Sequence, residues 1–249
     1  EEKIPDIINK GRRTLSLSKA MKSSIGLTTM EFDEKFQMYL KKVYWPEIAV
    51  RDEPARVGKK LTDHEKDGSY FNEKPVYSPD GEMIAFYSDR SDFTQIYLMS
   101  AVDGKILKNL VKGERSGDLE SLHSFVSGLS WSWDGKFIAF AAKSGGKDAL
   151  MIYNVEKRKI VDRIKPGFGA IMGPCWTPDG QLIFTGVSGG KADLYITDIK
   201  EKRPRKLTDD TFDDKDAVIT ADGKKLAFAS DRPVHSGGTG RYKYGNYNI

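Results

Sequence analysis

The side chains of this 249-residue chain best suited to chemistry are three histidines set among carboxylates. Imidazole nitrogens and carboxylate oxygens bind metal ions, and they also hydrogen-bond to peptides. The histidines lie far apart and lack the short spacing that places two ligands on one ion, so we assign no metal and no cofactor. We expect contacts with a protein or peptide partner instead. The candidate partner-binding residues are His64, Glu65, Asp118, Glu120, His123, Asp213, Asp214, His235 and Arg241.

Motifs for catalysis are missing from the sequence. The run His64-Glu65-Lys66-Asp67-Gly68 begins like a zinc-binding helix, but Gly68 stands where the second histidine belongs, and we expect a loop there. The sequence has no Gly-x-Ser-x-Gly elbow and no phosphate-binding loop. The single cysteine, Cys175, adjoins Trp176 in an expected strand, and we interpret it as a core residue. We therefore assign no catalytic residue in this chain.

A short turn recurs along the sequence with similar strands around it. Its first copy is Tyr77-Ser78-Pro79-Asp80-Gly81, and its aspartate recurs after 54, 45 and 43 residues. Asp-Gly between apolar runs predicts a tight hairpin, because glycine accepts the positive φ of such a turn. Repetition at this period is typical of propeller blades. The turn residues with an expected structural role are Asp80, Gly81, Asp134, Gly135, Asp179, Gly180, Asp222 and Gly223.

Alternating apolar residues after each turn predict β-strands, with Phe86, Phe140, Phe184 and Phe228 at equivalent inward positions. Two more strands follow, and four antiparallel strands in about 40–45 residues make one propeller blade. One blade cannot bury both of its faces, so neighbouring blades must stack. We predict a mainly β fold, part of a β-propeller of four-stranded antiparallel blades over residues 55–249.

Residues 1–50 differ from the rest because their apolar residues follow helical spacing. Gly26 is expected to end one helix, and the capping box from Thr28 to Glu31 to begin the next. Pro46 is expected to stop that second helix. The sequence thus predicts a short helical segment before the propeller, either a cap on it or the tail of an upstream domain.

The repeats resemble a known family. Ser88-Asp89-Arg90 and Ser230-Asp231-Arg232, together with the Ser-Pro-Asp-Gly turn, resemble the WD40-like (PD40) repeat of TolB-like β-propellers. The second and third repeats depart from it, with Ala142-Lys143 and Gly186-Val187 where the Asp-Arg pair is expected. The resemblance implies a ring of about six blades and a non-catalytic scaffold for protein or peptide binding. It also implies association with the cell envelope, in the periplasm or secreted.

The helical segment through Leu40-Lys41-Lys42-Val43-Tyr44-Trp45-Pro46 resembles the tail of gluzincin-type peptidase domains. This second resemblance implies a zinc peptidase domain upstream, so the enzymatic status of a full-length parent is left open. The alternative function is therefore a regulatory or gating propeller of a larger peptidase. Its catalytic part would be that upstream zinc domain or a downstream prolyl-oligopeptidase-like hydrolase.

The two ends of the repeat region indicate an incomplete propeller. Lys59-Lys60-Leu61-Thr62-Asp63 matches Arg205-Lys206-Leu207-Thr208-Asp209, which predicts an outer strand before the first full blade. Ile249 aligns with the start of a third strand, so we expect the propeller to be incomplete at its C-terminus.

Charge and loop length narrow the kind of partner. Residues 61–249 hold 27 basic and 27 acidic side chains, which argues against nucleic acid. No apolar run is long enough to form a transmembrane segment. In a propeller, tight turns and longer loops emerge on opposite faces, and the longer loops here are 63–72, 113–125, 209–216 and 232–245. Binding is expected on this long-loop face.

Overall fold

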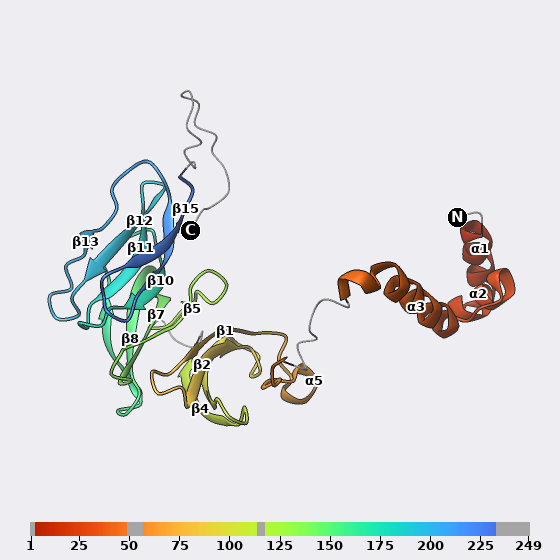
Figure 1. Cartoon of the computed structure of the whole chain (residues 1–249), viewed down its shortest axis with the longest axis horizontal. Coiled ribbons are helices and arrows are strands. Elements are labelled where there is room, and N and C mark those ends of the chain that lie inside the picture. The colour runs from red at the N-terminus through yellow and green to blue at the C-terminus, as the bar shows by residue number, and fades with distance from the viewer. Residues whose placement is uncertain (1–2, 49–56, 114–117, 233–249) are drawn as a thin grey trace. The chain divides into compact units, whose positions relative to one another are not determined.

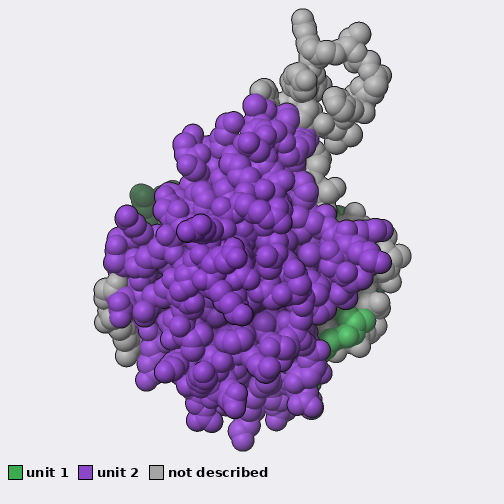
Figure 2. Space-filling model, turned by 90° about the vertical axis from the view of Figure 1, so that its left-hand side faces the viewer, with its two compact units in different colours: residues 1–60 green, residues 61–249 purple. Residues whose placement is uncertain are grey.

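The structure is a computed structural model, and it describes residues 3–48, 57–113 and 118–232 (Figure 1). Contacts divide the chain into two units, residues 1–60 and residues 61–249 (Figure 2). The first unit is helical and the second consists of antiparallel sheets. The prediction of a mainly β chain with helices at its N-terminus is confirmed.

Three helices form the first unit: α1 (Ile4–Thr14), α2 (Leu17–Ile25) and α3 (Thr29–Ile48). Gly26, at a φ of 75°, ends α2 as expected. The capping box is present, because Thr28 N donates to Glu31 Oε2 at 2.7 Å and Glu31 N to Thr28 Oγ1 at 3.2 Å. The hydrogen bond from the Thr28 backbone, followed by that from Lys22, lowers the pKa of Glu31 to about 2.

The prediction that Pro46 stops the helix is wrong, because α3 continues to Ile48. Proline's fixed φ of about −65° is a helical angle, so the last turn of a helix can contain a proline although one backbone hydrogen bond is lost. The expected loop at residues 64–67 is wrong as well. It is one turn of helix, α5 (His64–Asp67), which Gly68 ends at a φ of 71°.

The second unit follows the predicted four-stranded blades. Within each sheet the strands pair antiparallel, mostly in sequence order. Blade 1 contains β1 (Asn72–Tyr77), β2 (Met83–Ser88), β3 (Gln95–Ser100) and β4 (Ile106–Lys112). Blade 2 contains β5 (Ser121–Leu122), β6 (Ser130–Trp131), β7 (Phe137–Ser144), β8 (Lys147–Asn154) and β9 (Lys159–Ile164). Blade 3 contains β10 (Ala170–Trp176), β11 (Leu182–Ser188), β12 (Lys191–Thr197) and β13 (Arg205–Lys206). Blade 4 is described for β14 (Asp214–Ile219) and β15 (Leu226–Ser230).

In each of the four Asp-Gly turns a hydroxyl donates to the aspartate, and in three of them that aspartate also accepts a backbone N–H. In the first turn, Ser78 Oγ donates to Asp80 Oδ1 at 2.5 Å. Asp80 Oδ1 also accepts the N–H of Glu82 at 3.0 Å. Gly81 takes a φ of 75°, which glycine adopts without strain. The Ser78 hydrogen bond also lowers the pKa of Asp80. Hydroxyls at positions 132, 177 and 220 hold Asp134, Asp179 and Asp222 in the same way.

Apolar packing between neighbouring blades forms the core. Phe140 packs in one cluster with Tyr87 and Leu98 of blade 1, and Phe184 packs in another with Ile164 of blade 2. Phe140 and Phe184 are fully buried. Burying such a side chain contributes about 1.5–3 kcal/mol, so Phe140 and Phe184 stabilise blades 2 and 3 against the blade before each.

The prediction of an outer strand at residues 59–63 is wrong, because no strand forms there. An outer strand forms only by pairing with a neighbouring strand, and no described strand pairs with this segment. Leu61 instead packs against the blade 1 cluster of Ile84, Phe86, Tyr97 and Met99. Leu61 therefore covers part of the blade 1 face that carries this cluster.

Candidate partner-binding site

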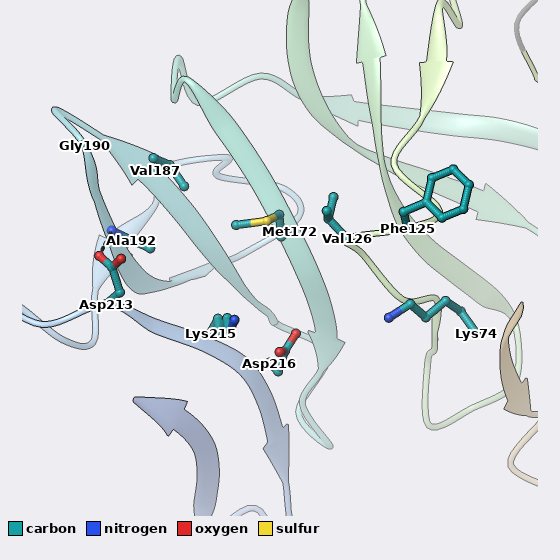
Figure 3. A pocket seen from close by; sticks show the side chains of 10 residues that line it. All are labelled: Lys74, Phe125, Val126, Met172, Val187, Gly190, Ala192, Asp213, Lys215 and Asp216. Atoms are coloured by element: carbon teal, nitrogen blue, oxygen red, sulfur yellow. Dashed lines mark hydrogen bonds between the residues drawn. The ribbon is translucent and has the colours of Figure 1, made fainter. Parts of the chain in front are cut away.

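A cavity of about 410 Å³ lies where three inner strands begin, and we call it the inner-strand cavity. Figure 3 shows side chains from β1, β10 and β14 and from the segment before β6 around it. It is lined by Lys74, Phe125, Val126, Met172, Val187, Gly190, Ala192, Asp213, Lys215 and Asp216.

A bulge in each of these inner strands shapes the cavity. The register of β1, β10 and β14 shifts next to Lys74, Gly173 and Asp216, whose φ angles are 51°, 54° and 55°. A β-bulge bends its strand and redirects side chains. Lys74 and Asp216 are not glycines, so each pays about 1–2 kcal/mol for this backbone conformation. Both line the cavity, and strained residues of this kind cluster at functional sites.

An exposed apolar rim adjoins the cavity. Phe125 is 73% exposed and Val126 is 55% exposed, although both are large apolar residues. The Phe125 ring lies 5.5 Å from that of Phe71, which limits its freedom. Tyr70 is 92% exposed one residue away from Phe71. Aromatic side chains fixed beside a cavity are typical anchors of protein interfaces.

Charges of both signs line the cavity floor. Asp213 and Asp216 face the same space as Lys74 and Lys215. Figure 3 shows Lys74 extending from the β1 side toward β10. Asp213 is fixed in place, because its Oδ1 accepts the N–H of Ala192 at 2.9 Å and its own N–H donates to Asp231 at 2.8 Å. Such a surface can hydrogen-bond to the backbone and polar side chains of a peptide.

Of the candidate residues taken from the sequence, Asp213 lines the inner-strand cavity. His64 and Glu65 lie in α5, where His64 Nδ1 is 3.0 Å from both the carbonyl and the hydroxyl oxygen of Ser69. Asp214 is fully buried and binds Arg232 at 2.6 Å. His235 and Arg241 lie outside the described residues.

The remaining candidates serve contacts within blade 2. Asp118 lies 3.7 Å from Arg163. Glu120 Oε1 accepts the N–H of Gly146 at 2.9 Å. His123 Nε2 lies 3.0 Å from Asp148 Oδ1, and Asp148 also accepts the N–H of Ile171 in blade 3. Asp118, Glu120 and His123 thus contact neighbouring residues and do not line the inner-strand cavity.

Sequence reasoning missed most of the cavity lining. The available signal was the apolar pair Phe125-Val126 inside an otherwise polar loop. Lys74 and Asp216 carried no such signal, because a bulge is set by strand pairing and is not visible in residue types.

The described residues give little support for metal binding or for a cysteine nucleophile. Within residues 3–48, 57–113 and 118–232, no group of three or more His, Cys, Asp or Glu side chains is placed to hold a metal ion. Burial raises the pKa of the Cys175 thiol, which makes it a poor nucleophile. No described helix is both long enough and apolar enough to cross a membrane.

The repeated four-stranded antiparallel sheets define a propeller-type protein, and comparison with known proteins agrees. A family model described as "TolB beta propeller domain" matches residues 111–244. "Protein TolB homolog" of Chlorobium luteolum is 30% identical over 152 residues, 61% of this chain and 32% of that protein. "Tol-Pal system protein TolB" of Nitratidesulfovibrio vulgaris is 30% identical over 103 residues, 41% of this chain and 23% of that protein. The chain thus spans about a third or less of these relatives.

Solved structures show the same fold. The crystal structure of TolB from Acinetobacter baumannii aligns with a TM-score of 0.55 and 24% identity, covering 70% of this chain and 40% of that one. A putative TolB from Agrobacterium tumefaciens aligns at 0.56 and 20% identity, covering 65% of this chain and 55% of that one. The chain belongs to the TolB β-propeller family.

Proposed function

We propose that this chain is a non-catalytic scaffold that binds a protein or peptide partner at the inner-strand cavity. The observation that carries the proposal is the exposed rim of Phe125 and Val126 beside a cavity of about 410 Å³. Family membership supports a cell-envelope role, in the periplasm or after secretion, and one relative is named "Tol-Pal system protein TolB".

Physical reasons favour a peptide over a small molecule. The cavity is open, charges of both signs line it, and the apolar side chains of Phe125 and Val126 are exposed beside it. A small-molecule pocket is usually enclosed and mostly apolar. A partner segment that covers Phe125 would bury apolar surface worth about 25 cal/mol per Å². The charged floor would then fix its register through hydrogen bonds.

The test begins with a photo-crosslinking amino acid at position 125, on the cavity rim. The matched control carries it at position 77, because Tyr77 is 60% exposed at the opposite end of β1. A partner that crosslinks from position 125 and not from position 77 is then titrated against Phe125→Ala. We expect affinity to fall by about 2 kcal/mol, in line with loss of an aromatic hot spot. Equal crosslinking from both positions would contradict the site.

The second candidate function is a gating propeller within a larger peptidase. "Uncharacterized peptidase YuxL" of Bacillus subtilis is 28% identical over 158 residues, 63% of this chain and 21% of that protein. Sequencing the intact parent protein separates the two candidates. A His-Glu-x-x-His helix upstream or a Gly-x-Ser-x-Gly elbow downstream would favour the peptidase, and the inner-strand cavity would then face its substrate path.

A further inference from the structure

A second cleft lies on the outer side of the propeller, between blades 1 and 2. Its volume is about 350 Å³. It is formed by residues of β4 and β9 together with Asp118 and Leu119. Apolar side chains that include Leu110, Leu119 and Ile160 line it. Four cationic side chains surround them, Lys112, Arg158, Lys159 and Arg163. We call this the basic side cleft.

The cations of this cleft are poorly neutralised. The structure places one carboxylate in the cleft, that of Asp118, which is 78% exposed and 3.7 Å from Arg163. Across the described residues, no carboxylate lies within ion-pair distance of Lys112, Arg158 or Lys159. Partial burial, together with the nearby charge of Arg158, also lowers the pKa of Lys108 on β4. Like charges are thus held together here at an electrostatic cost that a bound anion would relieve.

Protection of a sheet edge does not account for this cluster. Outer strands do carry lysines that prevent edge-to-edge pairing. Blade 3 shows how such a lysine is neutralised, because Lys206 on β13 binds Asp193 at 3.0 Å and Asp209 at 2.5 Å. Among the described residues, Lys112, Arg158 and Lys159 have no equivalent carboxylate partners, and edge protection does not need the apolar lining of the basic side cleft.

We propose that the basic side cleft binds an acidic peptide segment of a partner protein, with carboxylates on the cationic rim and apolar side chains on the apolar lining. A long polyanion fits less well, because the basic surplus is local and residues 61–249 are neutral overall. The cleft is separate from the inner-strand cavity and shares none of its lining residues.

The test uses the full chain and a fluorescein-labelled peptide of alternating Glu and Leu, followed by fluorescence anisotropy. The cleft variants are Arg158→Glu and Arg163→Glu. The matched control is Arg205→Glu, the same charge change at an exposed position of an outer strand in blade 3. We expect each cleft variant to weaken binding about tenfold at low salt, and the control less than about twofold. Added salt should weaken wild-type binding as well.

Several outcomes would overturn the proposal. They are no binding by the wild type, equal loss in Arg205→Glu, and binding to phosphatidylserine vesicles in place of the peptide. Unchanged thermal unfolding of each variant verifies that the fold is intact, and Arg158→Gln serves as a milder change with an expected intermediate loss. Phe125→Ala should leave peptide binding unchanged, which separates this cleft from the proposed function.

Discussion

Blades 1 and 3 fill the same internal space in two different ways. In blade 1 the guanidinium carbon of Arg90 lies 5.3 Å from the ring centre of Phe86 and 5.0 Å from that of Tyr97. In blade 3 the equivalent rings, Phe184 and Tyr195, are met by the ring of Phe168 at 5.9 and 4.4 Å. An aromatic ring therefore occupies the place of an arginine.

The difference explains why the third repeat has glycine in place of the serine of Ser-Asp-Arg. Arg90 is held by Asp67 at 3.3 Å and by Asn72 at 3.0 Å. Gly186 replaces the serine of the motif, and a Cβ there would lie 3.0 Å from the rings of Phe168 and Tyr195. Glycine thus makes room for the ring.

Blade 4 returns to the arginine form. Arg232 binds Asp214 at 2.6 Å and lies 5.5 Å from the ring centre of Phe228. The Ser-Asp-Arg motif is therefore an internal clamp that joins the entry loop of a blade to its second strand. The comparison with blade 3 teaches that a repeated motif can serve packing and can be replaced where another side chain fills the space.

The largest loss of stability is expected from removing the phenylalanine ring that is present in both blades, Phe86 in blade 1 and Phe184 in blade 3. Phe184→Ala should lower the free energy of unfolding by about 3–5 kcal/mol, because the side chain is fully buried and leaves a cavity. Denaturant unfolding measures it. Val218→Ala, at a position that is 61% exposed, is the control and should change stability by less than about 0.5 kcal/mol. A small loss for Phe184→Ala would mean that Phe168 collapses into the space.

Breaking the Arg90 clamp of blade 1 should lower the free energy of unfolding by nearly as much. Arg90→Ala leaves Asp67, whose side chain is 16% exposed, without its cation, and such a loss costs about 3 kcal/mol. Arg205→Ala, on an exposed outer strand, is the matched control. If both variants unfold at the same denaturant concentration as the wild type, Arg90 is not a clamp.

Gly186→Ala tests whether the Phe168 ring fills the space beside position 186 in blade 3. The added methyl group meets two rings at 3.0 Å, so we expect a loss of about 1–2 kcal/mol. A double-mutant cycle with Phe168→Ala should remove most of this loss, because the methyl group then has room. Additive effects of the two substitutions would show that Phe168 is not what excludes a side chain at position 186.

The smallest expected effect is a loss of stability in blade 1 at low pH. Burial raises the pKa of Asp67, but hydrogen bonds from Ser69 and the charge of Arg90 outweigh it and leave this pKa below its ordinary 3.8. A lowered pKa gives stability that is complete above about pH 3.8 and is lost as the pH falls through the folded value. The blade 3 contact of Phe168 has no such dependence.

Hydrogen exchange, corrected for its intrinsic pH dependence, should therefore show β1 and β2 losing protection before β10 and β11 on acidification. Equal loss in both blades, or earlier loss in blade 3, would contradict the assignment of the clamp.

Much of the fold could be predicted from the residues. The Asp-Gly turns, the repeated phenylalanines and the helix cap at Thr28 are local signals, because turn geometry, strand alternation and capping act over a few residues. The outer strand at residues 59–63 could not be predicted in this way. Whether a segment forms a strand depends on a neighbour that supplies hydrogen bonds, and the match to Arg205–Asp209 carried no information about that neighbour.

The same difference between local signals and long-range contacts applies to the candidate sites. The sequence by itself determined the repeat, the antiparallel blades and the apolar positions between them, since each follows from periodicity and turn chemistry. Only the tertiary structure decided that Phe168 stands where Arg90 stands in blade 1, and that Lys74 and Asp216 line the same cavity. Those pairings join residues far apart in the chain, and their distances are set by how whole blades stack, which no local pattern encodes.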